Sequence, residues 1–487
     1  MTFCLRIHTK SAVYTLMAVL LSTFISLHLK AQQNPIIFSP LSSGFYQAKI
    51  NQLQKYTVPQ KYTDKSPQAW YKEMMTDRNT ALIHLFKDDG VIYDTLLLNK
   101  CNVIGNRIIA ANKNYNFDSV KFYINRSSVP NAACYGDGTI MVNLGLFLWI
   151  DNDDELALVL GHEMSHQVLN HLESQLEKNI AKLTSEDFKD ELKDIKKSKD
   201  GKYDRFKKLM KDFSVETSKH STYKETEADS LAEVMIKRAG FNTFNGSLIL
   251  LKLDNSDAIY TASTLYSVRE FFEKKPVDQS FFVVKRKYNG LSSANVTMNA
   301  DVDFDSIKTH PDCIKRYEAV AGFGTKPTVN CCTTLTSAYS VYKERAMQEI
   351  VRNLYENKAI GLCAHFCIFA LNNHYNPAVY NEFLSLCFSQ LYWSDKHLER
   401  YNAVNAKATR ETTLKSLQDY LFDASIADLD KLSDYFLGNT TDAATEDMEF
   451  AKLMRNTQVE SKDIAYAYDS FNRKYPHSKY QYLLKKK

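Results

Sequence analysis

Apolar residues recur at helical spacing in the segment that follows residue 152. Leu156 and Leu160 are four positions apart, as expected for a helix that buries one face. The segment opens with Asn152 and Glu155 at the spacing of a capping box, and its first turn is acidic. The pattern predicts a buried helix over residues 153–173.

This predicted helix contains the sequence His162-Glu163-Met164-Ser165-His166, an H-E-x-x-H motif. Residues four apart lie on one helix face, so both imidazoles can reach the same ion. Zinc lowers the pKa of a bound water from about 15.7 to about 7, and a neighbouring carboxylate can accept the proton. The motif therefore predicts one zinc ion on His162 and His166, with Glu163 as the general base for hydrolysis of a peptide bond. The alternative is a core helix whose histidines only satisfy hydrogen bonds.

The apolar face of a second predicted helix carries two carboxylates. Glu225 and Asp229 are four residues apart, and they share their face with Ala228 and Ile236. A buried carboxylate requires a partner, and a catalytic zinc site requires a third protein ligand. Glu225 is the candidate for that ligand, and Asp229 for a carboxylate that accepts the outer N–H of a ligand histidine. The alternative for Glu225 is a capping box with Thr222.

The N-terminal pattern is typical of an exported protein. An apolar run over residues 12–27 follows Arg6 and Lys10, and Ala31 offers a small residue at the end of a signal peptide over residues 1–31. An uncleaved anchor is the alternative. The leader holds three basic residues, so the net charge of +4 falls to +1 without it, and no affinity for nucleic acid is expected.

The remaining pattern divides the chain into three parts. Residues 32–100 are expected to be a mostly helical lead-in, 101–325 the core around the motif, and 326–487 a helical region. The Lys-, Asp- and Glu-rich segment 172–219 predicts either a helical lid over the site or a solvated helix pair. Apolar positions in 359–387 predict antiparallel helix pairs.

The last helices weakly resemble a tetratricopeptide unit, and stacked units of that kind form concave surfaces that hold peptides or partner proteins. The alternative for residues 326–487 is a helical extension that packs on the core.

Eight cysteines follow the leader, and an exported chain can oxidise some of them. Cys313 with Cys331 or Cys332 is a candidate disulfide. Cys363 and Cys367 share a helix face, where one turn holds the backbone too rigidly for a good bridge, so buried thiols are expected.

The succession H-E-x-x-H and then E-x-x-x-D resembles the M48 family of zinc metallopeptidases, and the similarity extends over roughly residues 70 to 325. The resemblance implies that His162, His166 and Glu225 bind zinc. It makes Glu163 the base, and Asp229 the carboxylate behind a ligand histidine.

Other segments support the resemblance. Residues 120–125 resemble a strand of the family, residues 131–132 its Asn-Ala turn, and residues 138–143 its edge strand. Such an edge strand pairs with an extended substrate, which is read through its backbone. The alternative is an ordinary internal strand.

A third element, His310-Pro311 with Arg316, resembles the family's H-P-x-x-x-x-R sequence. The resemblance places His310 near the metal, where it would stabilise the developing oxyanion or occupy the fourth coordination position. The alternative is a histidine in a surface loop. Arg316 is expected to hold its loop to an acidic partner rather than to touch substrate.

These inferences predict an α+β, predominantly α fold: a zincin-like metallopeptidase domain with a small β-sheet, followed by a helical, TPR-like domain. The expected function is a zinc-dependent metalloendopeptidase of the periplasm that degrades misfolded or unassembled envelope proteins. Its expected partners are protein or peptide substrates, and envelope proteins at the helical domain; peripheral membrane association is left open. The alternative is a periplasmic chaperone or assembly factor whose zinc site is structural or vestigial.

Overall fold

The fold is described from a computed structural model, which covers residues 45–198, 200–256, 258–283, 313–321, 338–404, 412–438, 445–456, 461–478 and 480–481. The predicted signal peptide over residues 1–31, His310 and the candidate disulfide partners Cys331 and Cys332 lie outside these residues.

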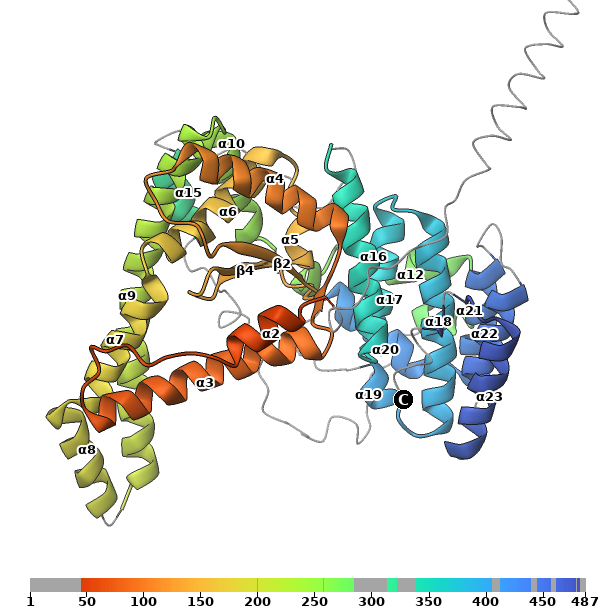
Figure 1. The fold of residues 1–487 in the computed structure, drawn as a ribbon. Coiled ribbons are helices and arrows are strands. Elements are labelled where there is room, and N and C mark those ends of the chain that lie inside the picture. Colours follow the sequence, from red (N-terminus) through yellow and green to blue (C-terminus); the bar gives the residue numbers. More distant parts are fainter. Residues whose placement is uncertain are drawn as a thin grey trace, which may run out of the picture. The chain divides into compact units, whose positions relative to one another are not determined.

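A small mixed sheet lies among the helices of the first half of the chain (Figure 1). Its strands are β1 (Val91–Ile92), β2 (Lys121–Asn125), β3 (Ala132–Cys134) and β4 (Thr139–Asn143). Their order in the sheet is β1-β2-β4-β3, with β2 parallel to β4 and the two outer strands antiparallel to their neighbours. Together with the many helices, this sheet confirms the expected α+β, predominantly α fold.

The expected edge strand over residues 138–143 is in fact internal. Val142 of β4 is paired with Ile124 of β2 on one side and with Ala132 of β3 on the other. The expectation was wrong because the segment with Asn131 and Ala132, taken for a turn, continues as the short edge strand β3. The first four residues of β4 are buried, as suits a strand with neighbours on both sides.

The helices that surround or follow the sheet are α2 (Gln47–Leu53), α3 (Lys65–Lys87), α4 (Thr95–Ala111), α5 (Leu144–Phe147), α6 (Asp153–Val168), α7 (His171–Thr184), α8 (Glu186–Lys197), α9 (Lys202–Arg238), α10 (Thr243–Asp254), α11 (Ala258–Thr261), α12 (Val268–Glu273), α13 (Ser280–Val283) and α15 (Cys313–Ala321). β1 and the first turn of α4 lie before residue 101. The sheet therefore begins inside the segment that the sequence predicts to be a helical lead-in.

The predicted helix over residues 153–173 is divided in two. It begins as expected, because the side chain of Asn152 accepts a hydrogen bond from the backbone N–H of Glu155 at 3.0 Å. It ends at Val168 because Asn170 takes a left-handed conformation, with φ of +52°, which Asn adopts more readily than most residues. α7 then starts at His171.

Close packing between α6 and α9 positions the residues of the motif. Gly161 of α6 faces Ala232 and Ile236 of α9, and a Cβ atom at position 161 would lie only 2.8 Å from Ile236 Cγ2. Ala228, Ala232 and Ile236 are fully buried, so the apolar face predicted for the second helix is found. The missing side chain at Gly161 lets the two helices approach, and this brings their polar residues together.

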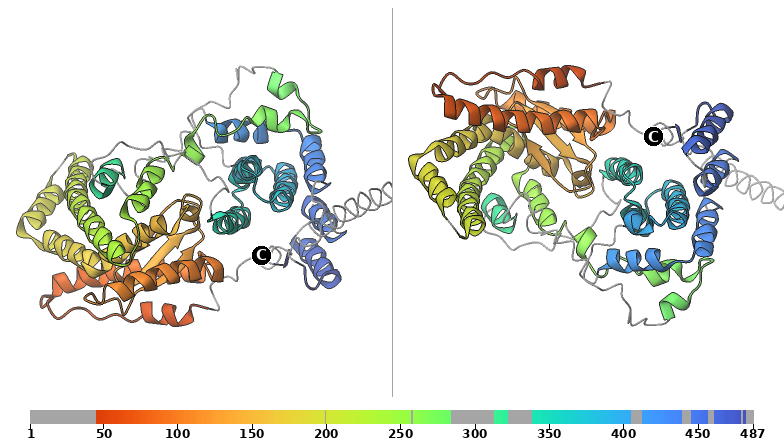
Figure 2. Two further views of the ribbon diagram at one scale, coloured as in Figure 1. Left: turned by 90° about the horizontal axis from the view of Figure 1, so that it is seen from above. Right: turned by 90° about the horizontal axis from the view of Figure 1, so that it is seen from below.

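After residue 338, the described segments are helical: α16 (Ser340–Glu356), α17 (Ile360–Asn372), α18 (Pro377–Lys396), α19 (Arg400–Val404), α20 (Thr413–Asp423), α21 (Ile426–Gly438), α22 (Thr445–Asn456) and α23 (Ser461–Lys474). Figure 2 shows α16, α17 and α18 as neighbouring helices viewed nearly end-on.

The predicted antiparallel pair in this region is α17 and α18. Asn376 caps α18, and Pro377 occupies its first turn, where the missing N–H has no cost. Cys363 and Cys367 are buried free thiols, as predicted. The tetratricopeptide-like character of the region stays a prediction. None of the helices in the described ranges has the length and apolar content needed to cross a membrane.

Candidate metal centre

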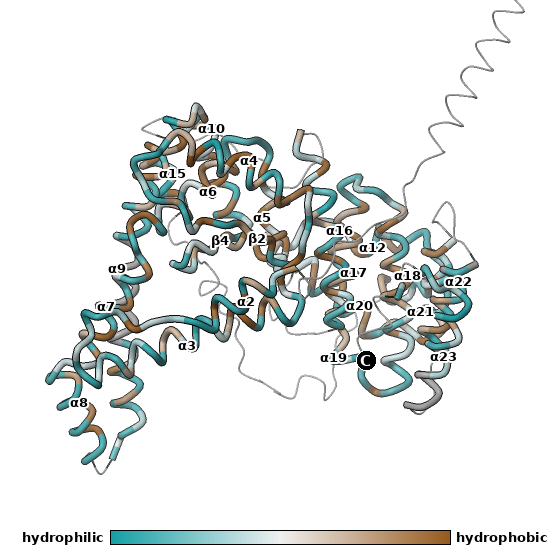
Figure 3. The backbone as a smooth tube through the Cα atoms, viewed as in Figure 1, coloured by the Kyte–Doolittle hydropathy of each residue, from teal (hydrophilic) through white to brown (hydrophobic). Residues whose placement is uncertain are grey.

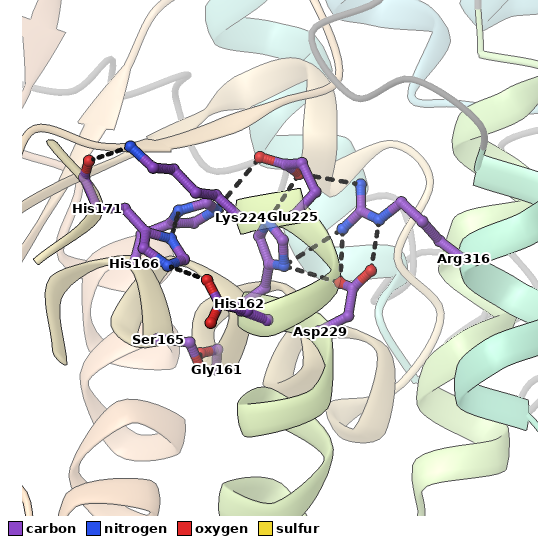
Figure 4. A network of polar contacts seen from close by, with 10 residues as sticks. Gly161, His162, Ser165, His166, His171, Lys224, Glu225, Asp229 and Arg316 are labelled. Carbon is purple, nitrogen blue, oxygen red and sulfur yellow. Dashed lines mark hydrogen bonds and ion pairs between the residues drawn. The ribbon is translucent and has the colours of Figure 1, made fainter. Parts of the chain in front are cut away.

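Three helices supply the polar side chains that meet at the candidate site (Figure 4). α6 carries His162 and His166, α9 carries Glu225 and Asp229, and α15 carries Arg316. Residues that are distant in the sequence are thus brought together, since α6 packs against α9 and α15 packs against both α9 and α10.

Two imidazoles and one carboxylate converge on a single point. His162 Nε2 lies 3.0 Å from His166 Nε2, and Glu225 places one carboxylate oxygen 3.3 Å from the first nitrogen and the other 3.4 Å from the second. Zinc–ligand bonds of about 2.0–2.1 Å hold the atoms of a tetrahedral site about 3.3 Å apart. The observed separations therefore fit one zinc ion. In the part of the chain that is described, no other group of histidine, cysteine and acidic side chains converges in this way.

Asp229 and Arg316 hold the first histidine in place. His162 Nδ1 donates to Asp229 Oδ1 at 2.8 Å, and Arg316 donates to both oxygens of the same carboxylate at 2.7 and 2.8 Å. A hydrogen bond from Nδ1 leaves the Nε2 lone pair for a metal. Arg316 also lies 3.6 Å from Glu225, so one guanidinium orders two acidic side chains.

Burial and hydrogen bonding oppose each other in setting the pKa values of these groups. Burial alone would raise the pKa of Asp229, but hydrogen bonds from Arg316 and His162 lower it to about 2. Burial and the charge of Arg316 act to lower the pKa of His162, but hydrogen bonds to Asp229 and Glu225 raise it to about 9. Without a metal, the His162 ring is therefore positively charged at neutral pH, with a proton on both nitrogens. A cation must displace the proton on Nε2 in order to bind.

His171 is a member of the site whose part the sequence did not predict. Its Nδ1 lies 2.8 Å from His166 Nδ1 and its side chain is buried. Burial, together with the charges of His166 and Lys224, lowers the pKa of His171 to about 4. A neutral His171 can accept the Nδ1–H of His166, which leaves His166 Nε2 for the metal.

The sequence analysis missed this contact because it extended α6 through residue 173, where His171 would lie about 140° away from the metal-binding face. The signal that reveals it is Asn170. An Asn at a helix end predicts the left-handed residue that stops α6 and redirects the chain. Lys224 then fixes the start of α7, because its ammonium donates to the carbonyl oxygen of His171 at 2.9 Å.

A pocket adjoins the site on the side of Glu163. It is a small, open pocket, with about 20 Å³ accessible to the centres of water molecules. Apolar side chains form much of its wall: Leu146, Leu158, Val159, Ile249, Leu250 and Leu253. His162, Glu163, Asp229 and Arg316 form its polar side, together with Asn131 and Ala132 at the start of the edge strand β3. Glu163 is only 3% exposed, so the carboxylate next to the histidines is largely shielded from bulk solvent.

The structure brings together all the candidate site residues that it describes. Glu225 lies in the middle of α9, which excludes the capping-box interpretation with Thr222. The side chain of the neighbouring Glu227 is 40% exposed, and its carboxylate oxygen Oε2 lies 3.5 Å from His171 Nε2. His310 lies outside the described residues.

A packed helix pair beside a small mixed sheet, with two histidines from α6 and a glutamate from α9 placed to hold a metal ion, is the arrangement of a metallopeptidase domain. Residues 100–323 match the model of peptidase family M48. This match confirms the resemblance to family M48 that was inferred from the motifs.

Two curated relatives carry the same name. The beta-barrel assembly-enhancing protease of Yersinia pestis is 38% identical over 96 residues, which are 19% of this chain and 20% of that protein. The protein of that name from Escherichia coli (strain K12) is 31% identical over 87 residues, 18% of each chain. The matched segments span about a fifth of the length of these relatives.

Proposed function

We propose that this protein is a zinc-dependent metalloendopeptidase with one ion bound by His162, His166 and Glu225. The observation that carries the proposal is the convergence of one ligand atom from each of these residues within 4.8 Å of one another, with Glu163 next to His162 in the lining of the adjoining pocket. Three protein ligands leave a fourth position open, as catalytic zinc sites do.

The residues of the chain divide the chemistry between them. A bound zinc ion would supply the Lewis acidity that activates water and polarises a carbonyl group. Glu163 takes the proton of the attacking water and passes it to the leaving amine. His162 and His166 are held in the metal-binding tautomer by Asp229 and His171, so the lone pairs need no reorientation during the reaction.

The surroundings of the site favour a peptide as substrate. The apolar wall of the pocket suits a hydrophobic side chain next to the scissile bond. The edge strand β3 packs against α6, and its outer edge offers the backbone groups that pair with an extended chain. The corrected sheet order therefore moves the proposed substrate-pairing strand from residues 138–143 to residues 132–134.

The biological role that we propose is degradation of misfolded or unassembled envelope proteins after export. The signal-like N-terminus supports export, and the relatives' name, beta-barrel assembly-enhancing protease, supports a role with envelope proteins. The helical region over residues 326–487 would bind protein partners. The competing function is a chaperone or assembly factor whose zinc site is only structural.

Replacement of Glu163 by Gln separates the two functions. The proposal predicts that E163Q loses about 10²–10⁴-fold in cleavage of an unfolded protein such as casein, because the general base is removed. Zinc content measured by elemental analysis should be unchanged, because Glu163 is not a ligand. The matched control is Glu191→Gln, an exposed residue of α8, which should cleave like the wild type. Full cleavage by E163Q would contradict the assigned base, and full biological activity of a cleavage-deficient E163Q would favour the chaperone.

A further inference from the structure

The turn between α8 and α9 concentrates positive charge. We call residues 196–211 the basic tip; they comprise the end of α8, the turn and the first part of α9 (Figure 1). This stretch has eight basic residues and two acidic ones, a net charge of +6, while the whole chain has +4. The rest of the chain is therefore net −2, and the tip alone accounts for the positive sign of the protein.

The charges of the tip are available to a partner. Every basic residue of the tip that the structure describes is exposed: Lys196, Lys197, Lys202, Arg205, Lys207, Lys208 and Lys211. Within the described part of the chain, none of them forms an ion pair, whereas Lys189 and Lys193 earlier in α8 pair with Glu186 and Asp190.

The tip also exposes large apolar side chains. Tyr203, Phe206 and Met210 are 75%, 45% and 38% exposed. Their spacing of three and four residues places them on one face of α9. Leu209 points into the hairpin instead, where it packs with Phe188 and Ile195 of α8. The hairpin thus has its own small core, so the exposed face is not needed to hold α8 and α9 together.

In Figure 3, α8 and the adjoining part of α9 are coloured mainly as hydrophilic. The tip is also remote from the candidate metal centre. Tyr203 precedes Glu225 by 22 residues on the continuous helix α9, which corresponds to about 33 Å at 1.5 Å per residue. The tip therefore lies too far along α9 to contact the metal centre itself.

We propose that the basic tip docks the protein onto an anionic lipid bilayer. Lysine and arginine would approach the headgroups, and Tyr203, Phe206 and Met210 would enter the interfacial region, as basic and aromatic side chains of interfacial helices do. The long helix α9 would then hold the metal centre about 33 Å from the membrane surface. This inference does not depend on the proposed peptidase activity.

The combination of charge and apolar exposure favours a membrane over another polyanion. A nucleic-acid duplex would be bound through the basic side chains, with a strong dependence on salt, and would give Phe206 and Met210 no apolar environment. A bilayer satisfies both kinds of side chain, because its headgroups attract the lysines and its acyl boundary buries the apolar face.

Co-sedimentation of the full chain with vesicles tests the proposal. Vesicles of phosphatidylcholine with phosphatidylglycerol should bind the protein, and pure phosphatidylcholine vesicles should bind it much less. Replacing Lys202, Lys207 and Lys208 by Gln should weaken partitioning about fivefold per charge, or about a hundredfold in all. The matched control is a triple variant that removes the same charge from α3, in which the exposed Lys65, Lys72 and Lys87 are replaced by Gln. This variant should bind vesicles like the wild type.

Hydrogen exchange locates the contact and excludes binding through another apolar segment, such as the N-terminal run. Amides of residues 196–211 should exchange more slowly when phosphatidylglycerol vesicles are added, and those of α3 should not change. Equal binding by the tip variant and the α3 control, or unchanged exchange in the tip, would overturn the proposal. A third outcome would also overturn it: the double variant Tyr203→Ser, Phe206→Ser binds vesicles like the wild type, and duplex DNA displaces the protein from them completely. The tip would then be a general polyanion site.

Discussion

At the scale of single residues, His365 shows how burial fixes a protonation state. This side chain of α17 is fully buried; its Nε2 donates to the carbonyl oxygen of Ile259 at 2.7 Å, and its Nδ1 accepts from the hydroxyl of Tyr266 at 2.8 Å. Burial lowers the pKa of His365 from 6.5 to about 4. The folded protein therefore holds the neutral ring at pH values where the unfolded chain has taken up a proton.

The sign of the resulting pH dependence follows. Above pH 6.5 both states are neutral and stability is complete; as the pH falls from 6.5 towards 4, only the unfolded state gains a proton, so stability is lost. We expect His365 to account for a loss of about 2 kcal/mol in the free energy of unfolding between pH 7 and pH 5. Urea unfolding of His365→Gln should lack this component, whereas the exposed His84→Gln should retain it. An identical pH profile for all three proteins would contradict this account.

Residue spacing paired His162 with His166 and Glu225 with Asp229, because residues four apart lie on one helix face. The need of a zinc site for a third ligand and the resemblance to family M48 then joined the two pairs into one predicted site. His171 could not be found in that way, because its position depends on where α6 ends. That ending is decided by one left-handed residue, Asn170, and not by the apolar pattern.

At the scale of elements, the approach of α6 to α9 depends on Gly161. Its missing Cβ leaves room for Ile236, and the two helices bring His162 to within 3.3 Å of Glu225. Gly161→Val should force the helices apart and cost about 1–3 kcal/mol in the free energy of unfolding, with weaker zinc binding. Gly161→Val combined with Ile236→Ala should recover part of both losses, because the clash is relieved. Calorimetric titration with zinc measures the affinity, and unfolding in urea measures the stability. If Gly161→Val matches the wild type in both measurements, the glycine does not have this role.

The existence of the elements was easier to predict from the sequence than their ends and neighbours. The caps at Asn152 and Asn376 are local features, and both helices begin where those residues indicate. The order of strands is not local. The short apolar run in residues 139–143 did not reveal its neighbours in the sheet, and only the pairing with β3 shows that the strand is internal.

At the scale of the whole molecule, buried ion pairs join α16 to the region of the sheet. Arg126, directly after β2, pairs with Glu356 at 2.7 Å, and both side chains are 2% exposed. Arg345 pairs with Asp94 at 2.5 Å, and Lys343 with Asp151 at 2.6 Å. The first helix after residue 338 is thus tied to residues that precede α6.

Loss of one member of a buried pair is costly, because the other charge stays buried. Glu356→Met should lower the free energy of unfolding by about 3–5 kcal/mol, since Arg126 and Arg352 both lose a buried carboxylate partner. Arg126→Met together with Glu356→Met should lower it much less, because the remaining buried charges stay balanced: Arg352, which also pairs with Glu356, keeps Glu349 at 3.3 Å. Denaturant unfolding gives both values. A double variant as unstable as Glu356→Met would show that the packing, and not the charge pair, matters.

The domain boundary predicted between residues 325 and 326 rests on a change in the spacing of apolar residues. Such a change does not show which residues form ion pairs across the boundary. Arg126 and Glu356 are 230 positions apart, and each is an ordinary charged residue in the sequence. Their meeting is a property of the tertiary structure, which local spacing does not encode.

The central claim is that His162, His166 and Glu225 hold one zinc ion. Its most direct test is the zinc content of purified protein after dialysis, measured by elemental analysis for the wild type, Glu225→Ala and the control Glu233→Ala, two turns further along α9. The account predicts one zinc ion per chain in the wild type and in Glu233→Ala, and a large loss in Glu225→Ala. A wild type without zinc, or a Glu225→Ala variant that keeps its full content, would contradict it.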